Sequence, residues 1–392
     1  MDGKNMHFCF EAKDKQGKHV YVIYTAKLSE RWTKSDSPLH FTKEVVITNG
    51  VPSMGCGVFN SKLVLAGGSV KSKQYEYNVK YRGVITCDLT TKQVSTSEIP
   101  PMPGGKVRPL VFQLDNKLFA LDTSKNPDQN AGAFEVYYPE RQRWHQLRID
   151  YYHSVGHLAD PQSKGLSFYS WFVFGHCVCL SLPKDSATFL YQAKNMYRYF
   201  QHIDTEPLPF PGMAITYCQT DFQENVVLIT FSKGGLVEGR LLRFPFYKFY
   251  DKPAVQILDT KIYSQHDGDL TGCFTHFGNG TFCLTAFDNV DIYVHMFKIS
   301  RRKCRKGEDL NIRLIDRSMH RYKYTDFSEA GHTSFSFAGC FSPSPPAGWS
   351  KENTEAKIYS SRFPLDEFNE ETDDIPNTLC AYEMIEEFAD DN

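Results

Sequence analysis

The chain has 392 residues, a formal net charge of −2 and a pI near 6.7, so it lacks the overall basic charge that holds nucleic acid through its phosphates. Its 30 Phe and 22 Tyr far outnumber its 9 Met, which favours sheets over a helical bundle. No segment approaches the roughly 18 apolar residues of a membrane span, and the first ten residues lack the apolar segment of a secretory signal.

The cysteine content bears on the compartment of the protein. The chain holds 11 Cys, an odd number, without a secretory signal. Thiols in such a protein are expected to be reduced, which predicts a cytoplasmic location, with the nucleus as a further possibility. The basic run at 301–306 is interpreted as a solvated loop, with a nuclear-import signal as the alternative.

The first fifty residues contain three segments typical of strands. They are rich in aromatic and β-branched residues and lie at 7–10, 19–24 and 44–48. None of them contains the turn pair that marks the repeat farther along the chain. We therefore expect them to belong to a sheet that is completed by another part of the chain.

From residue 53 onward one unit recurs, with starts near 53, 109, 169, 213 and 272. Each unit is an apolar strand, a short turn and a second apolar strand. The turns of the first two units are Asn60 with Ser61 and Asp115 with Asn116, residue types that suit tight hairpins. Cys177 and Cys179 fall two apart on one such strand, so they are expected to share a buried face.

A third and a fourth strand complete several of the units. The segments at 134–147 and 187–200 each contain a strand, a polar turn and a bulky residue that opens the next strand, and the exits at 99–105 and 207–212 are rich in Pro and Gly. Four strands per unit is the size of one blade of a β-propeller. The sequence therefore predicts an all-β protein with a single closed propeller.

The repeat resembles the kelch motif. The resemblance rests on Gly67 and Gly68 after a strand, on Tyr138, on Trp144, and on Met102 between two prolines. The chain is similar to plant kelch-repeat and galactose-oxidase-like propellers and lacks the helical F-box that many of them carry. That resemblance implies a protein-interaction scaffold or adaptor.

Both ends of the chain are expected to close the ring, because closure removes open sheet edges. Residues 7–50 and 333–363 would build one blade, which gives six four-stranded blades within residues 1–365, with seven as the alternative. Residues 366–392 form a strongly acidic tail. The protein is expected to be a monomer.

The loops that enter the first strand of each blade should meet at one mouth of the central channel. Their charged and imidazole side chains are the candidates for binding a ligand or a partner: Arg108, His157, His266, Asp267 and His332, with Lys106, His153, Asp269 and Glu329 beside them. A polar excursion at 71–81 carries aromatic candidates for protein recognition, namely Tyr75, Tyr77 and Tyr81, and Tyr151 and Tyr152 lie in a later loop.

Two functions remain open from the residues alone. The preferred hypothesis is a protein-interaction scaffold that uses the propeller face. The alternative is a cofactor-independent lyase, isomerase or hydrolase, or a small-molecule binding protein, with its site at the channel mouth. No zinc-ligand spacing and no catalytic motif is found, so no metal, no cofactor, no nucleic acid and no membrane is predicted as a partner.

Overall fold

The structure is a computed structural model, and it describes residues 4–28, 38–71, 78–122, 134–149, 170–174, 177–182, 187–192, 199–204, 208, 210, 212–217, 225–231, 236–243, 248–249, 255–256, 271–278, 280–288, 290–301, 312–327 and 333–342. The chain divides into two compact units, Met1–Trp349 and Ser350–Asn392. All described residues lie in the first unit. The acidic tail expected at 366–392 and the boundary expected before it fall outside them.

One sheet combines strands from both ends of the described chain. Its order is β28 (Thr333–Phe341), β1 (Lys4–Lys13), β2 (His19–Leu28) and β3 (Phe41–Ile47). β1 is antiparallel to both neighbours, so Cys9 lies opposite Ile23 on one side and Gly339 on the other. A sheet that combines strands from both ends was expected, because the apolar segments near the two ends lie outside the repeated units.

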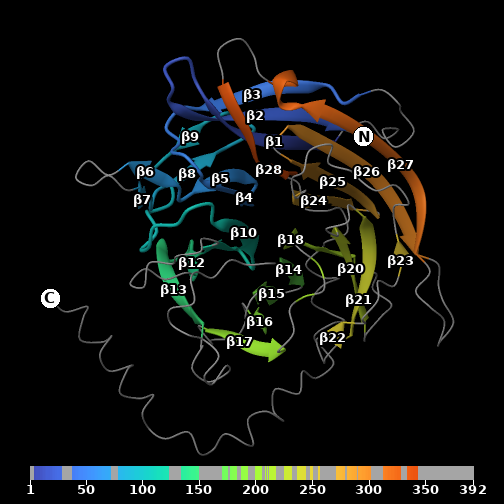
Figure 1. The fold of residues 1–392 in the computed structure, drawn as a ribbon. Coiled ribbons are helices and arrows are strands. Elements are labelled where there is room, and N and C mark those ends of the chain that lie inside the picture. The colour runs from blue at the N-terminus through green and yellow to red at the C-terminus, as the bar shows by residue number, and fades with distance from the viewer. Residues whose placement is uncertain are drawn as a thin grey trace, which may run out of the picture. The chain divides into compact units, whose positions relative to one another are not determined.

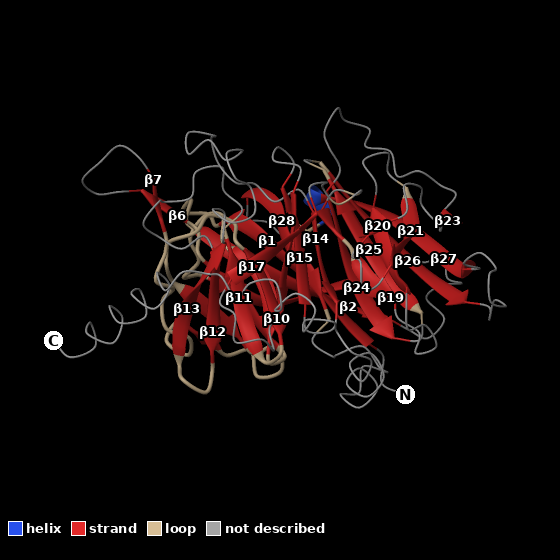
Figure 2. Ribbon diagram, turned by 90° about the horizontal axis from the view of Figure 1, so that it is seen from below, coloured by secondary structure: helices blue, strands red, loops and turns tan. Residues whose placement is uncertain are grey.

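The second sheet has the order β4 (Gly55–Phe59), β5 (Lys62–Ala66), β8 (Val84–Cys87) and β9 (Val94–Ser95). Between β5 and β8 the chain leaves this sheet and forms a separate two-stranded hairpin of β6 (Ser69–Lys71) and β7 (Asn78–Lys80). Figure 2 shows this hairpin standing away from the sheets.

The third sheet has nine strands. Its first run is β10 (Leu110–Leu114), β11 (Lys117–Leu121), β12 (Phe134–Tyr138) and β13 (Arg143–Ile149). Its second run is β17 (Tyr199–Asp204), β16 (Ala187–Gln192), β15 (Cys177–Leu182) and β14 (Ser170–Phe174), and β18 (Gly212–Met213) pairs with β14. The parallel pair of β13 and β17 joins the two runs.

Two further sheets follow. One contains β19 (Ile215–Tyr217), β20 (Asn225–Phe231), β21 (Val237–Arg243) and β22 (Lys248–Phe249), with β23 (Val255–Gln256) also paired to β21. The other contains β24 (Thr271–Gly278), β25 (Thr281–Phe287), β26 (Asp291–Arg301) and β27 (Ile312–Lys323). A short 3-10 turn, η2 (Tyr324–Asp326), follows β27.

The predicted number of six separate blades, with seven as the alternative, is wrong for the described residues. Their hydrogen bonds form five sheets of four strands or more and the separate β6–β7 hairpin. The reason is the pairing of Arg148 and Ile149 in β13 with Tyr199 and Phe200 in β17, which merges two neighbouring four-stranded runs. Fourth strands carry no turn motif of their own, so the sequence repeat does not indicate how they pair.

The first strands of the sheets follow one another around a common centre (Figure 1). Strand β28 contacts β4, β4 contacts β10, β14 contacts β19, and β24 contacts both β19 and β28. Between β10 and β14, Phe112 stacks on Trp171 with ring centroids 5.4 Å apart. Radially arranged sheets with their first strands innermost make this fold a β-propeller.

The hairpin turns have the conformation that their residue types predict. Asn60 and Ser61 have φ of 48° and 64°, and Asp115 and Asn116 have φ of 49° and 58°. Two successive residues with positive φ form the turn type whose twist matches paired strands. The turns therefore fix the register of β4 with β5 and of β10 with β11.

Apolar side chains fill the space between neighbouring sheets. One such core lies between the sheets of β4 and β10 and contains Leu118, Met102 and Trp144. Cys177 and Cys179 are both buried, as their spacing on one strand predicts. The described part of the chain contains no helix with the length and apolar character that crossing a bilayer requires.

Candidate functional site

The loops that enter β4 and β10 lie at the same end of the propeller. Gly55 faces Pro109, and Gly57 faces Val111, so the two inner strands run in the same direction. A Cβ on Gly57 would come within 2.3 Å of the Val111 carbonyl oxygen, so only glycine permits this approach. The name rim site is used here for residues 52–54, 67–69, 80–83 and 102–109 together with Asp122 and Glu135.

The paired glycines of the repeat organise the rim site. Gly67 and Gly68 have φ of 66° and 123°, a region that glycine adopts readily. The Gly68 N–H donates to the Lys106 carbonyl oxygen at 2.7 Å, and the Tyr81 N–H donates back to the Gly68 carbonyl oxygen at 2.8 Å. The glycine pair therefore connects its own sheet to the loop that enters the next inner strand.

A buried ion pair lies beneath this loop. The Lys106 Nζ is 3.1 Å from the Glu135 Oε2, and both side chains are completely buried. The Gly104 N–H donates to the Glu135 Oε1 at 2.7 Å. Burial lowers the pKa of Lys106 and raises that of Glu135, although each charge opposes the effect on the other. Lys106 was expected to face a ligand, and the structure instead places it in the interior because Glu135 neutralises it there.

A second ion pair fixes the base of the β6–β7 hairpin. The Lys80 Nζ at the end of β7 is 2.8 Å from the Asp122 Oδ2, which follows β11 in the next sheet. At the start of β6, the Ser69 N–H donates to the Pro52 carbonyl oxygen at 2.8 Å. The hairpin therefore leaves its sheet from a base that is tied on both sides.

Of the predicted mouth residues, the structure describes Lys106 and Arg108, and Arg108 is the exposed one. Its side chain is exposed, and its backbone has φ of 48°. The Arg108 N–H donates to the Ser53 carbonyl oxygen at 2.8 Å, and the Ser53 N–H donates to the Glu11 Oε2 at 3.1 Å. The loop backbone is therefore held in place while the guanidinium reaches the surface of the rim.

Trp144 of the repeat supports the same loop from the core side. Its ring packs with Tyr137 at a centroid distance of 5.4 Å, and its Nε1–H donates to the Pro100 carbonyl oxygen at 2.8 Å. Met102 lies in the same core and is completely buried. The bulky residue that opens the fourth strand thus fixes the Pro-rich exit of the preceding unit.

The other predicted site residues lie outside the described residues. These are His157, His266, Asp267 and His332, together with His153, Asp269, Glu329, Tyr75, Tyr77, Tyr151 and Tyr152. Tyr81 is described and packs partly buried against an apolar core, so it is not an exposed recognition residue. The convergence of the mouth residues therefore remains a prediction, apart from the position of Arg108.

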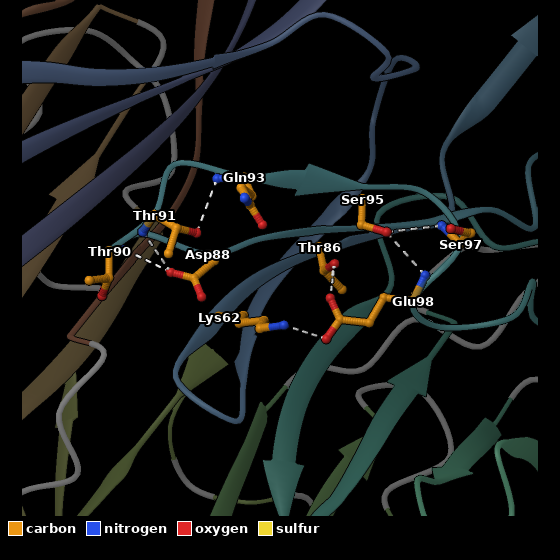
Figure 3. Close-up of polar contacts among 9 residues, drawn as sticks. All are labelled: Lys62, Thr86, Asp88, Thr90, Thr91, Gln93, Ser95, Ser97 and Glu98. Atoms are coloured by element: carbon orange, nitrogen blue, oxygen red, sulfur yellow. Dashed lines mark hydrogen bonds and ion pairs between the residues drawn. The ribbon is translucent and has the colours of Figure 1, made fainter.

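A different polar cluster lies at the β8–β9 turn and is shown in Figure 3. The Asp88 Oδ1 accepts hydrogen bonds from the backbone of Thr90 and Thr91, and these bonds lower its pKa. Glu98 accepts from the Lys62 Nζ at 2.5 Å and from the Thr86 Oγ1 at 2.6 Å, which lowers its pKa. These bonds join residues of the same sheet, so the cluster stabilises the turn and the sheet edge.

One recurrence in the sequence was missed. The dipeptide Gly-Cys occurs at 55–56, 272–273 and 339–340, and each copy lies on an inner strand, namely β4, β24 and β28. Small side chains suit the narrow centre of a propeller, and the recurrence would have marked these strands as innermost. Across the described ranges, no group of three or more His, Cys, Asp or Glu side chains is arranged to hold a metal ion.

No family model and no curated protein matches the chain. Among solved structures it is similar to YjhT, with a TM-score of 0.45 and 10% identity over 75% of this chain and 93% of that one. It is also similar to YCF48 bound to D1 peptide, with a TM-score of 0.38 and 7% identity over 80% and 83% of the two chains. The third is the Cps50 (Swd1) β-propeller domain of Myceliophteria thermophila, with a TM-score of 0.37 and 11% identity over 68% and 71%.

Proposed function

We propose that the protein is an interaction scaffold whose rim site presents the β6–β7 hairpin to a protein partner. The observation that carries this proposal is the hairpin itself. It is separate from the blade sheet, yet both of its ends are tied down, by Lys80 to Asp122 and by Ser69 to Pro52. A projecting element with a rigid base loses little conformational freedom when it binds.

The exposed side chains around the hairpin suit a protein partner. Val79 on β7 is 42% exposed, and Lys71 on β6 and Arg82 beside the hairpin are exposed too. Arg108 adds an exposed guanidinium in the neighbouring loop of the rim site. Arginine is enriched at protein interfaces, and a partly apolar contact with a charged, solvated rim is the usual composition of such a surface.

The proposal also covers the kelch-type relationship, the oligomeric state and the cellular location of the protein. Gly68 and Trp144 support a kelch-type relationship, because each makes a hydrogen bond, described above, that joins one unit of the repeat to its neighbour. We further propose a monomer of the cytoplasm or nucleus whose thiols are reduced in the absence of an oxidant. The alternative, a cofactor-independent enzyme or small-molecule binding protein, depends on His157, His266, Asp267 and His332, which lie outside the described residues.

A photo-crosslinking amino acid at position 79 tests the proposal. Val94 offers a matched control, because it is 39% exposed and lies on β9 of the adjoining sheet, outside the hairpin. In cells that express the intact protein, position 79 is expected to capture one partner in near-stoichiometric amount, while position 94 captures little of it. Arg108→Ala should reduce that capture severalfold.

Equal capture at positions 79 and 94, or none at either, would contradict the scaffold proposal. Native mass spectrometry of the purified protein then addresses the alternative. A bound small molecule that is lost in a His266→Ala variant and retained in the Val79 variant would support a ligand at the channel mouth.

A further inference from the structure

Six cysteines lie on neighbouring strands where the sheet of both chain ends meets its two neighbours. Three are on inner strands, Cys56 in β4, Cys273 in β24 and Cys340 in β28, and they are partly exposed. The other three, Cys9, Cys87 and Cys283, are buried behind them. The thiols thus form an accessible inner row and an inaccessible outer row.

The contacts within this group cross from one sheet to another. β24 and β28 belong to different sheets and lie next to each other. The Thr275 Oγ1 in β24 lies 3.5 Å from the Cys340 Sγ in β28, and Cys273 is two residues from Thr275 on the same strand. A hydrogen bond between the two thiols raises the pKa of Cys273. Side chains two apart on a strand point to the same face, so Cys273 lies on the face of β24 that Thr275 turns toward Cys340.

Cys340 is the better nucleophile of the two. Burial alone would raise its pKa, but hydrogen bonds from Cys273, Cys283, Thr285 and Thr275 together hold the pKa of Cys340 well below its usual range. Several donors directed at one sulfur stabilise its thiolate, which is the reactive form in exchange with a disulfide. Cys283 also contacts Cys340 but is completely buried, whereas Cys273 is partly exposed, so Cys273 is the thiol that can displace a small thiol from a mixed disulfide on Cys340.

We propose that Cys273 and Cys340 form a reversible disulfide, by exchange with a low-molecular-weight disulfide, that covalently joins β24 to β28. The Cys340 thiolate attacks one sulfur of the small disulfide, which gives a mixed disulfide and releases one small thiol. The Cys273 thiol then displaces the second small thiol. Two protein S–H bonds and one external S–S bond are lost, while one protein S–S bond and two external S–H bonds are formed.

The position of this pair determines what the bond does. β28 is the strand through which the end of the described chain pairs with β1, and β24 begins the adjoining sheet. A bond between them closes a loop that contains the whole β24–β27 sheet. The bond therefore resists the separation of β28 from the propeller. Without the bond, only non-covalent contacts oppose that separation.

Exposure of the intact protein to oxidised glutathione tests the proposal. The expected product has lost two hydrogen atoms without gaining glutathione, and non-reducing peptide mapping shows Cys273 linked to Cys340. Dithiothreitol restores both thiols. The thermal midpoint of the oxidised protein should rise by about 5 °C or more, given the stabilisation typical of a long disulfide loop.

Variants separate this pair from the other thiols. Cys273→Ser and Cys340→Ser should each abolish the cross-link, while Cys179→Ser, in the buried core of β15, should leave it intact. The peptide map of the parent protein decides the matter even if a variant folds poorly. A link between Cys9 and Cys56, a stable glutathione adduct on Cys340, or no reaction would each overturn the proposal.

Discussion

The β4–β13 region and the region formed by the sheets of β24–β27 and β28–β3 are built differently. In the first, most strands have five residues or fewer, and backbone and charged contacts, such as Gly68 with Lys106 and Lys80 with Asp122, add to the apolar core between the sheets. In the second, strands have 7 to 12 residues, and the contacts between sheets are aromatic. The same architecture is thus stabilised in two ways.

The aromatic region is centred on Phe10. Its ring lies 4.6 Å from that of Phe327 and 5.6 Å from that of Phe337, measured between centroids. Tyr24, Tyr324 and Phe335 surround the same ring. Long strands bury a large apolar area between two sheets, whereas short strands bury less, so defined polar contacts between loops contribute more. Substitutions in the two regions should therefore have different signatures.

The largest effect is expected from Glu135→Ala in the polar region. Removal of the carboxylate leaves Lys106 buried without its charge partner, which should lower the free energy of unfolding by about 3–5 kcal/mol in chemical denaturation. The double variant Lys106→Met with Glu135→Leu removes both charges and should recover most of that loss. A double variant as unstable as the single one would show that the charges are not the cause.

In the aromatic region, Phe10→Ala should lower the free energy of unfolding by about 3–5 kcal/mol, because the ring is completely buried and leaves a cavity. This loss should be independent of salt concentration, because no charge is involved. Phe10→Leu should lower the free energy of unfolding by less than half as much as Phe10→Ala does. A loss below about 1 kcal/mol for alanine would mean that this core is loosely packed.

Acid should weaken the aromatic region first. Burial lowers the pKa of His7 in β1 and of His295 in β26 from 6.5 to about 4. Because the unfolded chain takes up these protons at a higher pH than the folded one, stability falls as pH falls from 6.5 toward 4, by about 2–3 kcal/mol for each histidine. His7→Gln should flatten the pH profile of the unfolding midpoint over this range. An unchanged slope would contradict the assignment.

The smallest effect is expected at the solvated edge of the polar region. Lys62→Ala removes an ion pair to Glu98 in which both side chains are about one-third exposed or more. Such pairs contribute about 0–1 kcal/mol, and Glu98 keeps its bond from Thr86. Lys62→Ala should therefore lower the free energy of unfolding by less than about 1 kcal/mol in chemical denaturation. A much larger loss of stability would show that the polar cluster in Figure 3 stabilises more of the protein than its own turn and sheet edge.

The same division decides what could be predicted from the sequence. Asn60, Ser61, Asp115 and Asn116 determine turns by local backbone preference, and the hairpins they form were predicted. The ion pair between Lys106 and Glu135 was not predicted, because Glu135 is distant in the chain and no local pattern identifies it as the partner. The merging of β13 with β17 was missed for the same reason. Pairing without a turn signal is decided by the tertiary fold.

The place of β1 between β2 and β28 has a consequence for synthesis on the ribosome. β1 meets β2 almost at once, but its other edge stays open until β28 has emerged, after more than three hundred further residues. At ordinary elongation rates this takes on the order of tens of seconds. Throughout that interval the nascent chain exposes an apolar strand edge, which is the kind of surface that chaperones cover and neighbouring chains can join.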